Sequence, residues 1–155
     1  MEIFSSVAIA VHALSAIIWI GGMFFAYLIL GPSLSMLSPP DKIHAWSEIF
    51  PRFFQWVWMA VIALPATGYA MVFIDFGNFA SAGIHIHIMQ ALGLIMIALF
   101  IFLYFIPYKA FLRAVGAQEW ALAAKNLGTM RRIVGTNLIL GLITSAIAET
   151  GRIWA

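Results

Sequence analysis

The chain contains no cysteine, and charged residues make up only 9 % of its 155 residues. Without cysteine, disulfides, iron–sulfur clusters and thiolate metal sites are excluded, so any metal needs histidine, methionine, asparagine or carboxylate ligands. Soluble domains average roughly 25 % charged residues, and apolar residues here reach 64 %. Because a soluble fold of this length cannot bury so much apolar surface, the sequence predicts an integral membrane protein.

Signals of several other protein classes are also missing. The net charge is only +2, and no basic patch alternates with exposed aromatic residues, so nucleic acid is excluded as a partner. No Ser/His/Asp set, phosphate-binding glycine loop or pair of intramembrane carboxylates is present, which argues against hydrolysis and phosphoryl transfer. Whether the protein is an enzyme, for instance a membrane oxidoreductase, stays open at this point.

Four apolar segments, each near the ~20 residues that cross a bilayer, run through the chain. Only helices or closed barrels satisfy their backbone in lipid, so we expect an all-α membrane protein, an up-down bundle of four transmembrane helices. The bundle forms one domain over residues 1–155. The first segment follows no basic n-region and is expected to be retained. The helices are expected at about 4–30, 53–73, 84–106 and 133–154.

Prolines and aromatic residues mark features around these helices. The stretch SPPDKIHAWSEIF in the first connection predicts a short interfacial helix that begins at Pro39 and Pro40 and ends at Pro51. Pro65 is expected to kink the second helix. Several tryptophan and tyrosine residues suit the interfacial aromatic belt: Trp56, Trp58, Tyr108, Trp120 and Trp154.

The distribution of basic residues predicts the orientation of the protein in the membrane. Seven of the eight lysine and arginine residues lie in the connections 31–52 and 107–132. By the positive-inside rule these two connections face the cytoplasm, and both termini lie on the non-cytoplasmic side. The sequence thus predicts a multi-pass protein of a bacterial-type inner (plasma) membrane.

Three histidines lie in or beside apolar segments, where ionisable side chains are functional candidates. His12 is inside the first segment, and His85 and His87 begin the third. In an up-down bundle these two helices are parallel, and His87 comes nearer to the depth of His12. Residues two apart on a helix point about 200° apart, so His85 and His87 face different ways. The alternatives are a hydrogen bond from His12 to a neighbouring helix and interfacial snorkelling of the other two.

Two imidazoles from facing helices match the axial ligands of haem b, so we expect His12 and His87 to hold it near the non-cytoplasmic side. His85 is the substitute ligand or a donor at a second site. Haem predicts electron transfer or redox chemistry, with a quinol or another redox partner. The first alternative is a copper-binding protein for copper uptake or resistance, using His85, Met89 and His87. The second is a structural subunit of a respiratory complex.

The fourth segment carries polar and small residues at helical spacing, beginning with Asn137. This face either packs closely against another helix or lines the cofactor cavity. Arg152 is a candidate partner for haem propionates, the alternative being an interfacial ion pair with Glu149. The small-residue faces leave homo-oligomerisation open.

The stretches VHALSAIIWIGGMFF and MRRIVGTNLILGLITSAIAETGR, with a histidine in the third helix, resemble CopD-domain (copper resistance protein D-like) membrane proteins. A more distant similarity is to HemJ-type protoporphyrinogen oxidases, which bind haem b. The resemblance implies copper uptake or resistance, ligation by His12 and by His85 or His87, and core positions for Trp19, Arg132 and Asn137. The HemJ pattern has a lysine in its third helix and an acidic residue after the helix-four asparagine; this chain has neither.

Overall fold

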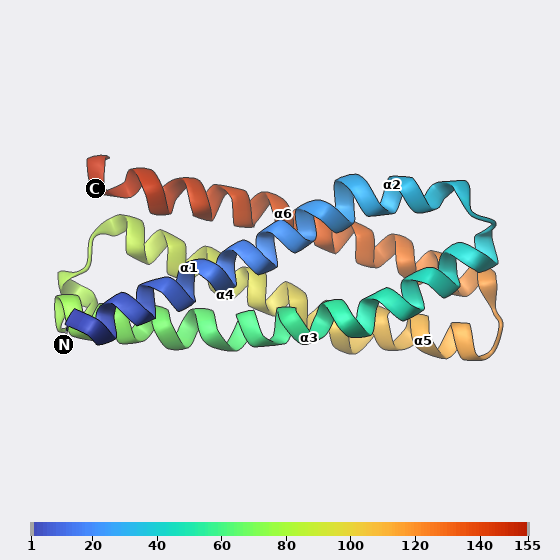
Figure 1. The fold of residues 1–155 in the computed structure, drawn as a ribbon, viewed down its shortest axis with the longest axis horizontal. Helices are drawn as coiled ribbons and strands as arrows, with labels where there is room; N and C mark the ends of the chain where they lie inside the picture. The colour runs from blue at the N-terminus through green and yellow to red at the C-terminus, as the bar shows by residue number, and fades with distance from the viewer. Residues whose placement is uncertain (1, 155) are drawn as a thin grey trace.

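The computed structural model describes the backbone of residues 2–154; the side chains at positions 2, 75, 76, 152 and 154 lie outside the described part. Four long helical rods run side by side, and the two termini lie at the same end of the molecule (Figure 1). All four rods are long and apolar enough to cross a membrane: Ile3–Met36, Pro39–Ile74, Ile84–Gly116 and Trp120–Gly151. The predicted all-α fold with four membrane-spanning helices is confirmed.

The first and third rods contain a π-helical turn in their interior. The first consists of α1 (Glu2–Phe24), the π-helix η1 (Phe25–Leu30), α2 (Gly31–Ser33) and the 3₁₀ turn η2 (Leu34–Met36). The third consists of α4 (Ile84–Leu103), the π-helix η5 (Tyr104–Tyr108) and α5 (Lys109–Gly116).

The other two rods each contain one long α-helix. The second rod is α3 (Pro39–Met71, 33 residues), followed by the π-helix η3 (Val72–Phe76) and the 3₁₀ turn η4 (Phe79–Ser81) in the connection. The fourth rod is α6 (Trp120–Trp154, 35 residues). We call the end with the termini and η4 the histidine end, and the end with the α2–α3 and α5–α6 connections the basic end.

The separate interfacial helix predicted before Pro51 does not form, because α3 passes through Pro51 and Pro65 without interruption. A proline removes one helical hydrogen bond, but the buried face of α3 continues across the position. Ile43, Trp46 and Phe50 precede Pro51 on that face, and it continues with Phe54 and Val57. Continuous packing of one face therefore outweighs the single missing hydrogen bond.

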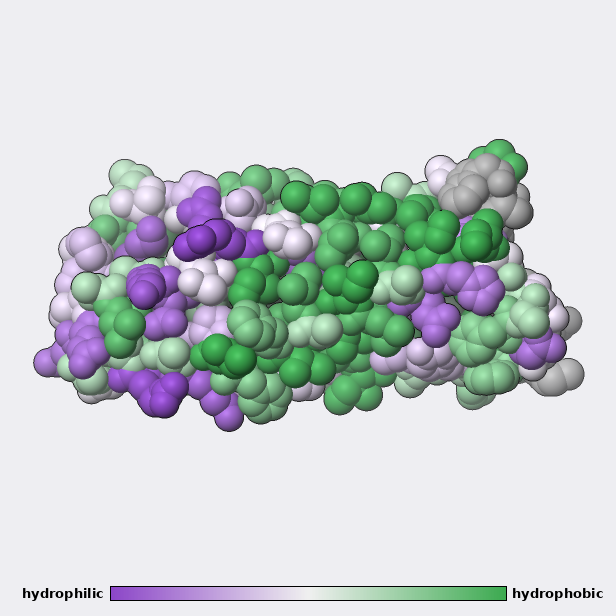
Figure 2. Space-filling view, turned by 180° about the vertical axis from the view of Figure 1, so that it is seen from behind, coloured by the Kyte–Doolittle hydropathy of each residue, from purple (hydrophilic) through white to green (hydrophobic). Residues whose placement is uncertain are grey.

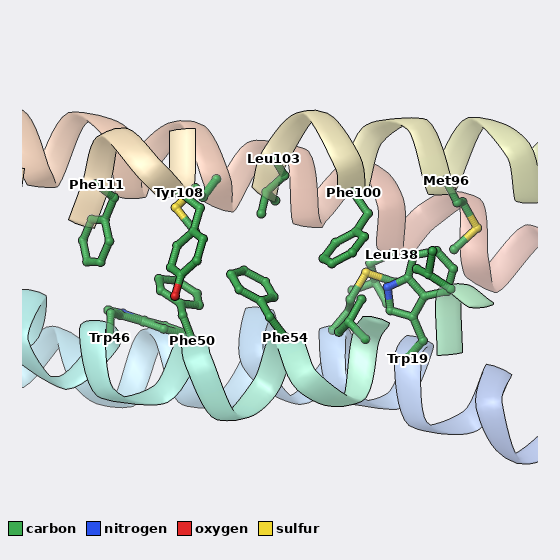
Figure 3. Packing of buried hydrophobic residues seen from close by; sticks show 14 of the residues in the cluster. Trp19, Trp46, Phe50, Phe54, Met96, Phe100, Leu103, Tyr108, Phe111 and Leu138 are labelled. Atoms are coloured by element: carbon green, nitrogen blue, oxygen red, sulfur yellow. The ribbon is translucent and has the colours of Figure 1, made fainter. Parts of the chain in front are cut away.

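An aromatic cluster fills the basic half of the bundle. The rings of Phe50 and Phe54 on α3 lie parallel at 5.3 Å, and Tyr108 meets Phe54 edge-on at 4.7 Å (Figure 3). Tyr108 is only 5 % exposed, so its predicted place in the interfacial belt is wrong. The members of the cluster are Trp19, Trp46, Phe50, Phe54, Trp58, Phe100, Tyr104, Tyr108 and Phe111.

The surface also differs between the middle of the bundle and its basic end. Figure 2 shows apolar residues over the middle of the bundle and hydrophilic residues gathered at the basic end. The apolar surface is extensive, and it includes Ile17 (66 % exposed) on α1 and Ile62 (66 %) on α3. Side chains of this kind face hydrocarbon in a membrane, which agrees with a multi-pass membrane protein.

Candidate functional site

His12 lies on the inward face of α1, between Ala8 and Trp19, and its ring contacts α3. Its Nδ1 lies 2.9 Å from the hydroxyl oxygen of Thr67. The Thr67 hydroxyl donates its own proton to the Ala63 carbonyl at 2.6 Å, so it accepts from Nδ1–H of His12. This assigned tautomer leaves Nε2 with a free lone pair. The hydrogen bond from Nδ1 therefore fixes the orientation of the imidazole ring and leaves Nε2 as an acceptor.

Gly68 allows this approach of the two helices. A Cβ at Gly68 would lie 3.3 Å from Cε1 of His12, tighter than an ordinary contact. The small residue on α3 thus lets the Cε1–Nδ1 edge of the imidazole ring approach that helix. Thr67 and Gly68 follow Pro65, and their position opposite His12 depends on the register of α1 against α3.

His85 packs at the start of α4 against α6. A Cβ added at Gly151 would lie 2.6 Å from the Cβ and Cγ atoms of His85, and one at Gly83 would lie 2.7 Å from Cε1. Glycine at both positions therefore makes room for this imidazole. Its Nδ1 is buried and has no hydrogen-bond partner within the described side chains.

His87 points toward a different element. Its ring lies 6.3 Å from that of Phe79 in η4, measured between centroids. Phe79 in turn packs edge-on against Tyr69 of α3 at 5.6 Å. His85 and His87 thus contact different parts of the bundle, in agreement with their two-residue spacing on the helix.

Gln90 and Tyr69, two further polar residues at this end, are not predicted from the sequence. Gln90 donates from Nε2 to the Tyr69 hydroxyl at 3.3 Å, joining α4 to α3. Gln90 is three residues after His87 in an otherwise apolar segment, which is the signal that would have identified it. Together with the His12–Thr67 bond, this contact makes the interior of the histidine end polar.

Met89 lies one helical turn after His85, on the same side of α4, and is partly buried. The two residues offer an imidazole and a thioether. Among the described residues, no three histidine or acidic side chains come close enough together to hold a metal ion. The donors at this end are therefore pairs and single groups rather than a closed cage.

Trp19 and Asn137 lie deeper in the bundle, as expected for core residues. Each is 3 % exposed, and Asn137 donates from Nδ2 to the Met96 carbonyl at 3.1 Å. Its Oδ1 is buried and has no partner within the described part of the chain. Arg132, which the family resemblance assigns to the core, is exposed. The Arg152 side chain and its predicted contact with propionates lie outside the described residues.

His12 and His87, the predicted haem pair, have different contacts. α1 packs mainly against α3, and α4 against α6. The ring of His12 is tied to Thr67, whereas His87 lies on Phe79, whose neighbour on α3 is Tyr69. Thr67 and Tyr69 are two residues apart and point to opposite flanks of α3. His12 and His87 therefore have different neighbours, on the two flanks of α3.

The fold and these side chains define a multi-pass membrane protein that carries His12, His85, His87 and Met89 in the same half of the bundle. Comparison with protein families matches residues 47–150 to CopD, described as copper resistance protein D. The chain therefore belongs to the CopD family. The match covers His85, His87, Met89 and Asn137 but not His12. No curated protein and no solved structure matches the chain.

Proposed function

We propose that the protein binds copper at the histidine end and acts in copper uptake or resistance, with the copper ion as its cargo. Family membership supports this function over haem binding. The donors support it as well, because imidazole and thioether groups suit copper, and thioethers favour Cu(I) in particular.

The observation that carries the proposal is the hydrogen bond from His12 Nδ1 to Thr67, 2.9 Å long. Metal-ligating histidines almost always donate their other ring N–H to an oxygen acceptor, which fixes the tautomer and the ring orientation. In a neutral imidazole that donates from Nδ1, the Nε2 atom keeps its lone pair and is able to bind a metal ion.

The copper ion first meets His85 and Met89 at the outer end of α4, with His87 nearby on the same helix. His12 lies deeper, about 15 Å along α1 from its first residue at 1.5 Å per residue. Donors spread along the helices in this way suit an ion that passes from one to the next, whereas a structural metal has a closed ligand set. On the predicted orientation, copper enters from the non-cytoplasmic side.

The test is a Cu(I) titration of the detergent-purified protein against a chromophoric chelator. We expect His12→Ala and the pair His85→Ala/Met89→Leu each to weaken copper binding by about 10- to 100-fold. The matched control is His44→Ala at the basic end, where the ring of His44 lies 5.1 Å from that of Trp120. This variant should bind as the unaltered protein does.

Two results would overturn the proposal. Equal copper affinity in all variants would mean that these histidines are structural. A Soret band in the purified protein that His12→Ala removes would replace copper with haem b as the group bound at His12. An absorption spectrum recorded before the titration separates the two cases.

A further inference from the structure

A cavity of about 390 Å³ opens at the basic end, between η1, α3 and α6. Trp46, Phe50 and Phe53 of α3 line one side, and Leu127 and Gly128 of α6 line another. Its volume falls in the range of roughly 300–1,000 Å³ typical of small-molecule sites. None of the histidines discussed above lines it, so it is separate from the proposed copper route.

Two positive charges border this apolar cavity. Lys42 and Arg131 belong to its lining, and the Arg131 guanidinium lies 5.1 Å from the centre of the Tyr27 ring. Within the described residues, the ion pair at this end joins Arg52 and Glu48 at 3.4 Å, so neither cavity cation has a carboxylate partner. The cavity therefore combines an apolar interior with uncompensated positive charge.

A π-helix shapes one wall. In η1 the Gly31 N–H bonds to the Ala26 carbonyl, five residues back instead of four. Ala26, Tyr27 and Gly31 all line the cavity. π-Helical turns are rare and frequently occur at functional sites, because the extra residue redirects the neighbouring side chains. Here the π-helical turn lies in the wall of the cavity that contains Tyr27, whose ring is beneath the Arg131 guanidinium.

We propose that this cavity binds an anionic phospholipid, with an acyl chain against the aromatic wall and the phosphate between Lys42 and Arg131. Charge complementarity selects the ligand, because both groups at the rim are cations. The cavity lining joins Lys42 and Arg131 to the aromatic core, and it lies toward the basic end, where hydrophilic surface gathers (Figure 2). Basic pockets between transmembrane helices bind anionic headgroups in this way.

Native mass spectrometry of the full chain, released from detergent with added lipid, tests the site. Phosphatidylglycerol and phosphatidylcholine with identical acyl chains are compared. We expect phosphatidylglycerol to bind about tenfold more tightly, and the variant Lys42→Gln/Arg131→Gln to lose this preference. The control Lys125→Gln/Arg132→Gln removes the same charge from exposed positions outside the cavity, and should keep the preference.

A steric variant tests the apolar part. A Cβ at Gly128 would meet nothing within 4 Å, so Gly128→Leu places its side chain in the cavity without a clash on the helix. We expect it to lower binding of both lipids several-fold. Gly93→Leu is the control, since Gly93 also has open space around its Cβ position and lies outside the cavity.

Three outcomes would overturn the lipid site. The first is a preference for phosphatidylglycerol that persists in Lys42→Gln/Arg131→Gln. The second is an equal loss of that preference in the control Lys125→Gln/Arg132→Gln. The third is normal binding of both lipids by Gly128→Leu. Inorganic phosphate is added as a competitor. Displacement of the lipid by phosphate at equal concentration would mean that the rim binds a free anion, which also contradicts the proposal.

Discussion

The two halves of this bundle are built differently. In the basic half, aromatic rings interlock between α3 and the α4–α5 rod, and Phe111 and Val57 are 0 % and 1 % exposed. Toward the histidine end, Ala8 and Val72 are buried but stand apart from the continuous core. The interior there consists of imidazoles, hydroxyl groups and glycines. One half of the molecule therefore supplies the packing, and the other keeps polar groups available.

This division indicates where the fold tolerates change. Close-packed interiors transmit strain and resist alteration of even one methylene group. Regions with few buried apolar contacts open at a lower free-energy cost. The proposed copper route would lie in the second kind of interior, while the aromatic cluster packs the helices together in the other half.

The largest effect is expected from Phe54→Ala. Phe54 is 4 % exposed and contacts rings on both sides, so its loss should lower the free energy of unfolding by about 3–5 kcal/mol. The control Phe73→Ala, at a residue 57 % exposed near the histidine end, should cost less than about 1 kcal/mol. Unfolding in mixed micelles measures both. Equal losses of unfolding free energy in the two variants would mean that the two halves do not differ in packing.

A smaller effect is expected from Gly151→Ala. The added Cβ would lie 2.6 Å from the Cβ and Cγ atoms of His85, which cannot move without shifting α4 from α6. We expect a loss of about 1–3 kcal/mol together with weaker copper binding. Gly93→Ala has open space and serves as the control. Unchanged unfolding in Gly151→Ala would show that the histidine end adapts without cost.

Thr67→Val separates ligand orientation from stability. The substitution keeps the side-chain shape but removes the acceptor for Nδ1–H of His12. We expect at least about a tenfold loss of Cu(I) affinity. Thr136→Val is the matched control, because its hydroxyl donates to the Arg132 carbonyl at 3.1 Å on exposed surface. A normal affinity in Thr67→Val would remove the role assigned to the tautomer.

The smallest effect is expected from Arg52→Gln. Arg52 and Glu48 form an ion pair of 3.4 Å, but both side chains are 75 % exposed. Removing such a pair should change the free energy of unfolding by less than about 0.5 kcal/mol. A larger loss by the same micelle assay would mean that charge, and not only aromatic packing, holds the basic half together.

The sequence predicts the four membrane-spanning helices well, because long apolar runs in lipid leave the backbone no other structure. At the basic end it is right only in part. The helix that begins at Pro39 is predicted, but as a separate element ending at Pro51, and α6 begins at Trp120, many residues before the apolar run at 133. Helix formation at this end follows from packing of the rods on one another, which hydropathy does not register.

The site was predictable only in part. Helical periodicity is enough to separate the directions of His85 and His87. Periodicity does not identify Thr67 as the hydrogen-bond partner of His12, because this contact depends on how α1 packs against α3. The haem hypothesis required His12 and His87 to face one slot between α1 and α4. The topology shows that α1 and α4 run in the same direction. Whether His12 and His87 face each other depends on the order of the helices around the bundle, which the topology does not give.

The first rod carries apolar surface from one end to the other. Ile3 is 83 % exposed and Met36 is 91 % exposed, and a helix joining them is about 50 Å long. The hydrocarbon core of a bilayer is only about 30 Å thick. The first rod is thus longer than the hydrocarbon core is thick, and such a helix is accommodated by tilting, by kinking or by local thickening of the bilayer. The depth of His12 below the membrane surface, and with it the distance that an ion would travel, then changes with the tilt of the bundle.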